Sequence, residues 1–381
     1  MCGIVGYSGP KEPLPILING LSRLEYRGYD SAGIAISDGD KITVEKKEGK
    51  LDVLKNHLKD SNIQGNIGIG HTRWATHGVP NDVNAHPHSD NSEEFAIIHN
   101  GIIENYAEIK KDLLEEGFEF KSDTDTEVVA VELSRKWNGE LLKTVTDVAK
   151  TLEGTYALVV TTTKEEGTIV AGRLMSPLVL GVGEKEVFLA SDSAAILEHT
   201  NKMIFLENGD FVEIKNGQYK LFDSDLNEIE REIQEIDWEV SEAEKLGHDH
   251  FMYKEILEQS EVIERTISGR LETTSKEIPI KQDEASKYEK IWIVACGTAY
   301  HAGLFGKDLF EKVLGVPVSV ELASEFRYRE PIVGENDLGI VVSQSGETMD
   351  TIAATDLLKE NGAHVLALVN VVGSSLARMA D

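Results

Sequence analysis

The chain begins MCGIVGY (residues 1–7), a cysteine followed directly by an apolar run that is typical of the start of a strand. If Met1 is removed, the α-amine of Cys2 lies on the same residue as the thiol. Because an α-amine has a pKa of about 8, it can act as the general base for that thiol. The alternative is that Cys2 is an inert, small hydrophobic residue that only packs.

Four later segments are dense in Arg, His, Asn, Asp and Gly, and each lies between apolar runs, where loops at the rim of a sheet are expected. They are RLEYRGYDSAG (23–33), HTRWATHG (71–78), IIHNGIIEN (97–105) and SDTDTE (122–127). With the early cysteine, these segments resemble those of the amino-terminal nucleophile (class II) glutamine amidotransferases, and most closely the glutamine–fructose-6-phosphate aminotransferase family. The resemblance covers the whole chain.

Length and composition narrow the class of protein. A chain of 381 residues favours two domains. No apolar stretch approaches the roughly 20 residues that cross a bilayer, and no signal peptide is recognisable, so the cytoplasm is expected. Cys2 and Cys296 are the only cysteines, which excludes a disulfide framework. The net charge of −29 argues against nucleic acid and anionic membranes as partners.

An acidic stretch divides the chain. Between Asp223 and Lys245, 10 of 23 residues are Asp or Glu, a composition typical of a solvated connector. We therefore predict a glutamine amidotransferase domain over residues 2–222, an acidic linker over 223–249, and the amino-terminal part of a sugar isomerase (SIS) domain over 250–381.

The first domain alternates short β-branched runs with helical patterns, which predicts antiparallel strands and an α+β fold. Helices are expected around residues 14–24, around 109–114, and over 125–137 with Thr124 as the cap. The resemblance implies a four-layer αββα arrangement, two antiparallel sheets between helices.

The second domain begins with an amphipathic helix over residues 250–270. Three buried strands follow, in IWIVACGTAY, LGIVVSQSGET and HVLALVNVVGSSL, and each runs into a turn of small hydroxyl residues. Strands followed by helical patterns predict an α/β parallel sheet, which binds ligands beyond the carboxyl ends of its strands. We expect this domain to be incomplete in the chain.

The turn SQSGET (343–348) combines three hydroxyls, a glycine and the start of a helix, a geometry that suits phosphate. A serine-rich helix cap is the simpler alternative. The Gly-Lys-Ser/Thr ending of a nucleotide P-loop is absent. The resemblance implies contacts to fructose 6-phosphate from Thr298, Ser343, Gln344, Ser345 and Thr348. Ala299 departs from the serine that relatives often carry there, which removes one polar contact to the sugar.

Glutamine hydrolysis needs a cation for the α-carboxylate, an anion for the α-ammonium and donors for the oxyanion. The resemblance assigns these roles to particular residues. Arg73 holds the carboxylate with Thr76 and His77 beside it, Asp125 holds the ammonium, and Asn100 with the Gly101 amide forms the oxyanion hole. Arg27 holds the amino-terminal loop over the site, and Trp74 lies at the mouth of an ammonia passage. Arg27 paired with Asp30, and Trp74 as a core aromatic, are the structural alternatives.

Five histidines, at positions 71, 77, 86, 88 and 99, lie close together in the sequence and raise the possibility of a metal site. Against it, no cysteine lies nearby and no helical pair occurs at i and i+4. We expect histidines in loops and in the core, and neither a metal nor another cofactor.

The resemblance implies a reaction in two halves. Cys2 splits glutamine into glutamate and ammonia through a thioester, and ammonia then aminates fructose 6-phosphate to give glucosamine 6-phosphate. Relatives usually run to roughly six hundred residues, well above one domain, and full-length members are expected to form homodimers. Because the groups for ring opening lie in the part not present, we expect this chain to stop at glutamine hydrolysis.

Two alternative assignments of function are considered. Amidophosphoribosyltransferase and asparagine synthetase share an amino-terminal cysteine domain, but SQSGET is neither a phosphoribosyl-diphosphate loop nor an ATP-pyrophosphate loop. A non-catalytic module that senses a phosphosugar is the second rival, and it would have no use for a thiol at position 2.

Overall fold

The computed structural model describes residues 2–25, 28–236, 248, 250–267, 287–371 and 373–381. The chain forms two compact units, residues 1–251 and 252–381.

The first unit contains two antiparallel sheets. The eight-stranded sheet has the order β15-β11-β9-β10-β1-β4-β2-β3 and the seven-stranded sheet the order β14-β13-β12-β8-β7-β6-β5. The strands of the larger sheet are β15 (Gln234–Glu235), β11 (Lys202–Phe205), β9 (Val179–Val182), β10 (Val187–Ala190), β1 (Gly3–Ser8), β4 (Ile67–Arg73), β2 (Ser31–Ser37) and β3 (Ile42–Glu48). Those of the smaller sheet are β14 (Glu228–Ile229), β13 (Gln218–Phe222), β12 (Phe211–Lys215), β8 (Thr168–Leu174), β7 (Gly154–Thr162), β6 (Phe95–Ile103) and β5 (His88–Ser89).

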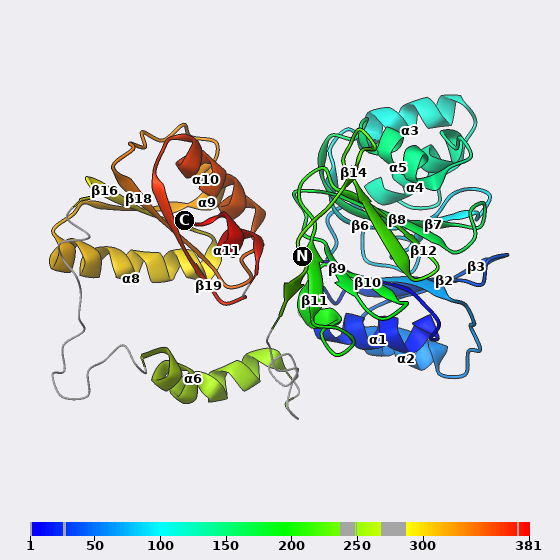
Figure 1. Ribbon diagram of the computed structural model, residues 1–381, viewed down its shortest axis with the longest axis horizontal. Helices are drawn as coiled ribbons and strands as arrows, with labels where there is room; N and C mark the ends of the chain where they lie inside the picture. The colour runs from blue at the N-terminus through cyan, green and yellow to red at the C-terminus, as the bar shows by residue number, and fades with distance from the viewer. Residues whose placement is uncertain (1, 26–27, 237–247, 249, 268–286, 372) are drawn as a thin grey trace. The chain divides into compact units, whose positions relative to one another are not determined.

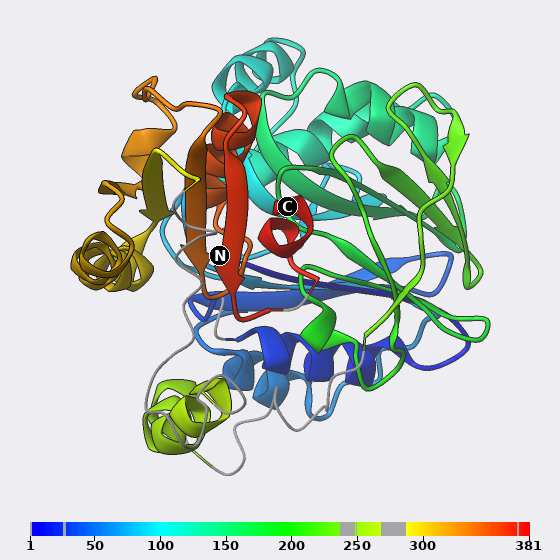
Figure 2. The same cartoon turned by 60° about the vertical axis from the view of Figure 1, so that its left-hand side comes forward.

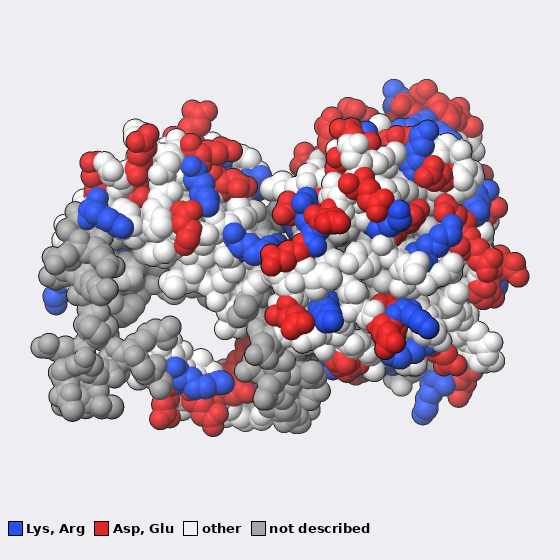
Figure 3. Space-filling model, in the orientation of Figure 1, with Lys and Arg blue, Asp and Glu red and all other residues white. Residues whose placement is uncertain are grey.

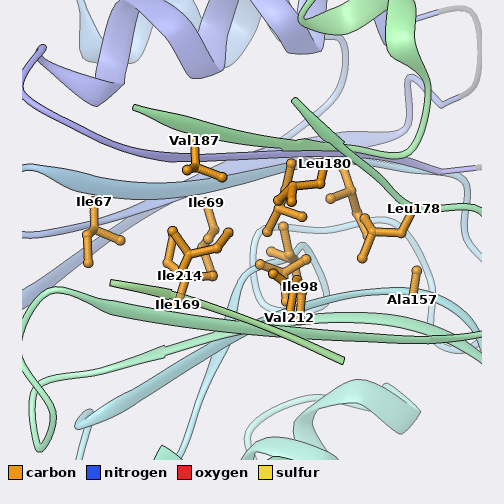
Figure 4. Close-up of a cluster of buried hydrophobic side chains, with 14 of the residues drawn as sticks. Ile67, Ile69, Ile98, Ala157, Ile169, Leu178, Leu180, Val187, Val212 and Ile214 are labelled. Atoms are coloured by element: carbon orange, nitrogen blue, oxygen red, sulfur yellow. The ribbon is translucent and has the colours of Figure 1, made fainter. Parts of the chain in front are cut away.

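The two sheets pack face to face over a core of buried aliphatic side chains, most of them branched (Figure 4). Ile4 of β1 and Ile69 of β4 enter this core from the larger sheet, and Ile98 of β6 enters it from the smaller sheet. Because side chains alternate along a strand, Ile4, Ile69 and Ile98 fix which face of each strand points between the sheets.

Helices cover the outer faces of both sheets (Figures 1 and 2). Apolar side chains of α1 (Pro13–Leu24) and α2 (Leu51–Leu58) pack on the larger sheet. Those of α4 (Asp125–Arg135) and α5 (Leu141–Ala149) pack on the smaller sheet, and α3 (Tyr106–Glu115) packs on α4. A short 3₁₀ helix, η1, spans Ser193–Ala195. The predicted four-layer αββα arrangement is confirmed.

The second unit begins with α6 (Phe251–Ile267) and contains a parallel sheet of order β17-β16-β18-β19. Its remaining elements are β16 (Lys290–Ala295), α8 (Gly297–Leu314), β17 (Val318–Leu322), α9 (Ala323–Phe326), β18 (Asp337–Ser343), α10 (Met349–Glu360), β19 (His364–Val369) and α11 (Ser375–Met379). Side chains of α8 pack with one face of the sheet, and those of α9, α10 and α11 pack with the other. The predicted parallel α/β sheet is therefore present, and β17 is a fourth strand that the sequence analysis did not identify.

The acidic stretch is partly structured in the first unit. Within it, β14 pairs with β13 and β15 pairs with β11, each as an edge strand. Along the chain, the division between the two compact units falls after residue 251. Residues 237–247 and 249 of the proposed linker lie outside the described residues. The domain boundaries given by the sequence therefore stay a prediction.

Charged side chains of both signs are interspersed over the face shown in Figure 3, with no continuous basic area among the residues described there. Within the described part of the chain, no helix is both long enough and apolar enough to cross a membrane.

Candidate active site

Cys2 lies directly before β1, two residues from Ile4, so its side chain extends the face that builds the core between the sheets. The thiol is half-buried. The Trp74 backbone N–H donates to Sγ at 3.2 Å. Burial raises the pKa of the Cys2 thiol, and the hydrogen bond from Trp74 opposes this rise. A thiol with a raised pKa needs a base before it can attack as a thiolate.

Asn100 of β6 faces Cys2 from the other sheet, because it continues the alternation that begins at Ile98. Its Nδ2 donates to the carbonyl oxygen of Cys2 at 3.1 Å. Gly101 follows with φ +130°, and a Cβ there would lie 2.0 Å from the Thr155 carbonyl oxygen. Only glycine suits that backbone. The side-chain amide of Asn100 and the peptide at Gly101 thus come directly beside the residue that carries the thiol.

Arg73 ends β4 and is 3% exposed. Its Nη2 donates to the backbone oxygens of His77 and Gly78, the latter at 3.2 Å. Its Nη1 is buried and has no partner among the described residues. Because an unpaired buried guanidinium nitrogen is costly, this donor marks a place for an anionic ligand group.

Asp125 is the first residue of α4 and is buried. Its Oδ2 accepts from the Ile103 N–H at 2.9 Å and lies 4.0 Å from His99 Nδ1. The predicted cap is present, since the Thr124 hydroxyl accepts from the Glu127 N–H at 3.2 Å. The cap fixes the helix start that carries the Asp125 carboxylate.

The loop after β4 carries the other predicted glutamine-site residues. Trp74 is 49% exposed and meets Tyr29 edge-on at 5.5 Å between ring centroids, so the core alternative for its side chain does not hold. Thr76 is exposed. His77 is half-buried against the ring of Tyr106 at 5.1 Å. Arg27 lies outside the described residues, so its role stays a prediction.

Asp30 supports this loop, a function that the sequence analysis missed. Its carboxylate accepts from the Ser31 hydroxyl at 2.9 Å and from the Ala75 N–H, and its own N–H donates to the Arg73 carbonyl at 3.2 Å. The sequence had suggested Asp30 only as a partner for Arg27. No local pattern reveals a contact that spans 45 residues.

Four histidines form a buried cluster, His71, His86, His88 and His99. The Thr126 hydroxyl lies 2.8 Å from Nε2 of His86 and 3.0 Å from Nδ1 of His99. Burial lowers the pKa of all four imidazoles, that of His71 to about 3. In the described part of the chain, no set of three His, Cys, Asp or Glu residues is arranged to hold a metal ion.

The second unit presents the SQSGET turn at the carboxyl end of β18. The chain moves from β16 outward to β17 and then returns to β18 on the other side of β16, so β16 and β18 flank a topological switch point. Ligands of open parallel sheets bind at such a point. Thr298, exposed in the first turn of α8, follows β16, and Ala299 comes next.

Within the turn, the polar groups are held by one another. Ser343 Oγ accepts from the Gly346 N–H at 3.1 Å and lies 3.1 Å from the Thr348 hydroxyl, while Ser345 Oγ accepts from the Glu347 N–H at 3.2 Å. Gln344 is exposed. Thr348 is also the residue before α10, whose 12 residues begin beside these hydroxyls. Phosphate binding and a serine-rich cap both remain compatible with this geometry.

Comparison with known proteins gives two family models. The glutamine amidotransferase domain matches residues 56–244 and the SIS domain matches residues 285–381. A relative named glutamine–fructose-6-phosphate aminotransferase [isomerizing] from Clostridium perfringens is 49% identical over 100% of this chain and 63% of the relative. The Aquifex aeolicus protein of the same name is 46% identical over 100% of this chain and 64% of the relative.

Among solved structures, glutamine phosphoribosylpyrophosphate amidotransferase from B. subtilis is similar, with a TM-score of 0.54 and 19% identity over 97% of this chain and 81% of that chain. This likeness shows the fold alone. The chain spans somewhat less than two thirds of the length of the curated relatives that it matches.

Proposed function

Because the chain belongs to the glutamine–fructose-6-phosphate aminotransferase family, we propose that it releases ammonia from L-glutamine at Cys2 and that the whole protein transfers this ammonia to fructose 6-phosphate. The observation that carries the proposal is the convergence of three groups between the two sheets. They are the Cys2 thiol, the Asn100 amide 3.1 Å from the Cys2 carbonyl, and the unpaired, buried Arg73 Nη1.

The first half of the proposed reaction is acyl transfer to sulfur. With Met1 removed, the α-amine of Cys2 takes the thiol proton, and the sulfur attacks the carboxamide carbon of glutamine. The oxyanion accepts hydrogen bonds from Asn100 Nδ2 and the Gly101 N–H. The amine then returns the proton to the leaving nitrogen, the C–N bond breaks, and ammonia departs. Water hydrolyses the γ-glutamyl thioester to glutamate and restores the thiol.

We expect the charged groups around the thiol to bind the α-carboxylate and the α-ammonium of glutamine. Arg73 Nη1 binds the α-carboxylate, with Thr76 and His77 on the same loop, and Asp125 binds the α-ammonium. The Trp74 backbone N–H donates to the sulfur, and its exposed side chain is proposed to lie at the mouth of the ammonia passage. Arg27 is proposed to hold the amino-terminal loop over the site.

The second unit is proposed to bind the sugar phosphate at its switch point. The hydroxyls of Ser343, Ser345 and Thr348 and the first amides of α10 hold the phosphate, and Thr298 and Gln344 contact the sugar. Ammonia condenses with the open-chain ketose, and isomerisation gives glucosamine 6-phosphate. This chemistry uses a thiol, an amine and hydrogen-bond donors, and it calls for no metal or cofactor. The homodimer stays a prediction that light scattering on the full-length protein can check.

Intact mass and turnover test the proposal together. Purified protein should lack Met1, gain one adduct from a diazoketone analogue of glutamine, and release glutamate from glutamine. Cys2→Ala should abolish both the adduct and glutamate release, whereas Cys296→Ala, which removes the other thiol, should preserve them. Full activity with Met1 still attached, or glutamate release by Cys2→Ala, would contradict the proposal. A wild type that is stabilised by fructose 6-phosphate but releases no glutamate would favour the sugar-sensing alternative. Assaying glucosamine 6-phosphate in the same samples decides whether the 381-residue chain stops at glutamine hydrolysis.

A further inference from the structure

His71 contacts the side chain of Asn100 across the two sheets. It stands two residues after Ile69 on β4, opposite Ile4 in the β1–β4 register, so it points between the sheets like Ile69. Its ring is fully buried, and Nε2 lies 3.0 Å from Asn100 Oδ1 and 3.0 Å from the His99 carbonyl oxygen.

The chemistry of these neighbours fixes the tautomer of the ring. The His99 carbonyl oxygen can only accept a hydrogen bond, so Nε2 must carry the proton whichever way the Asn100 amide is turned. Nδ1 is buried without a partner among the described residues. Because burial lowers the pKa of His71 to about 3, the ring is neutral at any pH used for assays and keeps a single N–H. That N–H is therefore directed permanently at the Asn100 side chain.

This contact decides which way the Asn100 amide faces. The oxygen and nitrogen of an amide are nearly equal in shape, so only hydrogen-bond partners distinguish the two orientations. With His71 holding Oδ1, the Nδ2 group faces Cys2 and donates to its carbonyl. In the flipped orientation an acceptor would face the place where the oxyanion forms, and Nδ2 would meet the N–H of His71.

We propose that His71 is a positioning residue for glutamine hydrolysis, which holds the Asn100 amide so that its nitrogen, and not its oxygen, faces the oxyanion. The inference rests on the proposed glutaminase function and adds a residue that does not touch glutamine. It separates the role of His71 from that of the other buried histidines, whose ring nitrogens bond to Thr124 and Thr126 of the α4 start.

The expected effect falls on turnover. Losing one oxyanion-hole donor costs about 10²- to 10³-fold in kcat. His71→Phe keeps a planar aromatic ring, slightly larger than imidazole, but removes the N–H. We therefore expect kcat for glutamine to fall by at least about 30-fold, while KM changes less than about threefold because Arg73 and Asp125 are untouched. His71→Gln places an amide N–H near the same position and should recover most of kcat.

Two measurements distinguish positioning from general damage. Alkylation of Cys2 by iodoacetamide is a displacement at a saturated carbon that forms no oxyanion, so its rate should be the same in wild type and His71→Phe. His199→Phe makes the same substitution at a ring stacked on Phe188 in the α1 layer and should leave kcat unchanged. Equal kcat in His71→Phe and wild type, or a parallel loss of kcat and alkylation rate, overturns the inference.

Hydrogen exchange of the Asn100 side-chain amide, followed by NMR, tests the same contact without turnover. Exchange should be slow in wild type and in His71→Gln and at least tenfold faster in His71→Phe. Unchanged exchange would overturn the inference. A wild type that releases no glutamate but shows these exchange rates would refute the proposed function and leave the positioning contact established.

Discussion

Replacing Arg73 by lysine separates the two tasks of its guanidinium. Nη2 holds the loop through the carbonyl oxygens of His77 and Gly78, and Nη1 is left for the ligand. A lysine ammonium is a single point charge on a flexible stem, so it can donate to the two carbonyl oxygens but lacks the second, separate nitrogen that Arg73 directs at the ligand. The variant should therefore keep the loop in place and lose the substrate contact.

The size of the loss follows from the type of bond removed. A hydrogen bond to a charged group contributes about 1.5–3 kcal/mol, and 1.4 kcal/mol corresponds to tenfold. We expect kcat/KM for glutamine to fall by about 10- to 150-fold in Arg73→Lys. Most of the loss should appear in KM, because the α-carboxylate is bound equally in the ground state and in the transition state.

A substrate without the α-carboxylate supplies the matched assay. The amide of γ-aminobutyrate keeps the carboxamide and the amine, so Arg73→Lys and wild type should hydrolyse it with kcat/KM values within about threefold of each other. Asp125→Asn should show the complementary pattern with glutaramate, which lacks the amine. If Arg73→Lys loses the same factor on both substrates, the assignment of Nη1 to the α-carboxylate is wrong.

Three further predictions concern stability. Because burial lowers the folded-state pKa of the four clustered histidines, the unfolded state binds more protons below about pH 6.5, and the free energy of unfolding should fall on acidification by up to about 1.4 kcal/mol per pH unit for each. Urea titrations between pH 7 and pH 5 measure this slope, and His71→Gln should reduce it by about one proton; an unchanged slope would contradict a buried neutral ring. Gly101→Ala meets a carbonyl oxygen at 2.0 Å, whereas Gly139 has a similar positive φ and nothing within 4 Å. Gly101→Ala should therefore cost at least about 1 kcal/mol more than Gly139→Ala in urea unfolding, and equal costs would rule out the steric term. Gly346→Ala would place a methyl 2.0 Å from a serine hydroxyl, so it should abolish thermal stabilisation by fructose 6-phosphate, while Gly306→Ala in α8, with no atom nearer than 3.7 Å, should preserve it.

The parts of the fold that depend on local pattern were predictable from the sequence. Neighbouring residues alone determine the periodicity of α1, the Thr124 cap and the β-branched runs of the two sheets. The fourth parallel strand, β17, was missed because VSVEL is only five residues long and follows a proline. Helices α2 and α5 were not identified either, although their buried leucines and valines have helical spacing.

Contacts between distant segments were not predictable. Asp30 supports the loop around Ala75 through a backbone N–H, which any residue type would supply. The high charge of the acidic stretch predicted a solvated connector, so β14 and β15 were not identified. Edge strands can carry this charge, because they pair on one side only and their side chains can point to solvent. Amino-acid composition indicates how side chains interact with water, whereas an edge strand pairs through backbone hydrogen bonds. An acidic composition therefore does not exclude an edge strand.

The position of the site follows from the same alternation that builds the core. Ile4, Ile69 and Ile98 point between the sheets, and two residues along each strand from these lie Cys2, His71 and Asn100. Period two keeps these polar side chains on the inner face, at the end of the apolar run of each strand. A single-residue shift of β4 against β1 would move His71 and Arg73 to the outer face together. The register that packs Ile69 into the core therefore also places His71 and Arg73 beside the thiol.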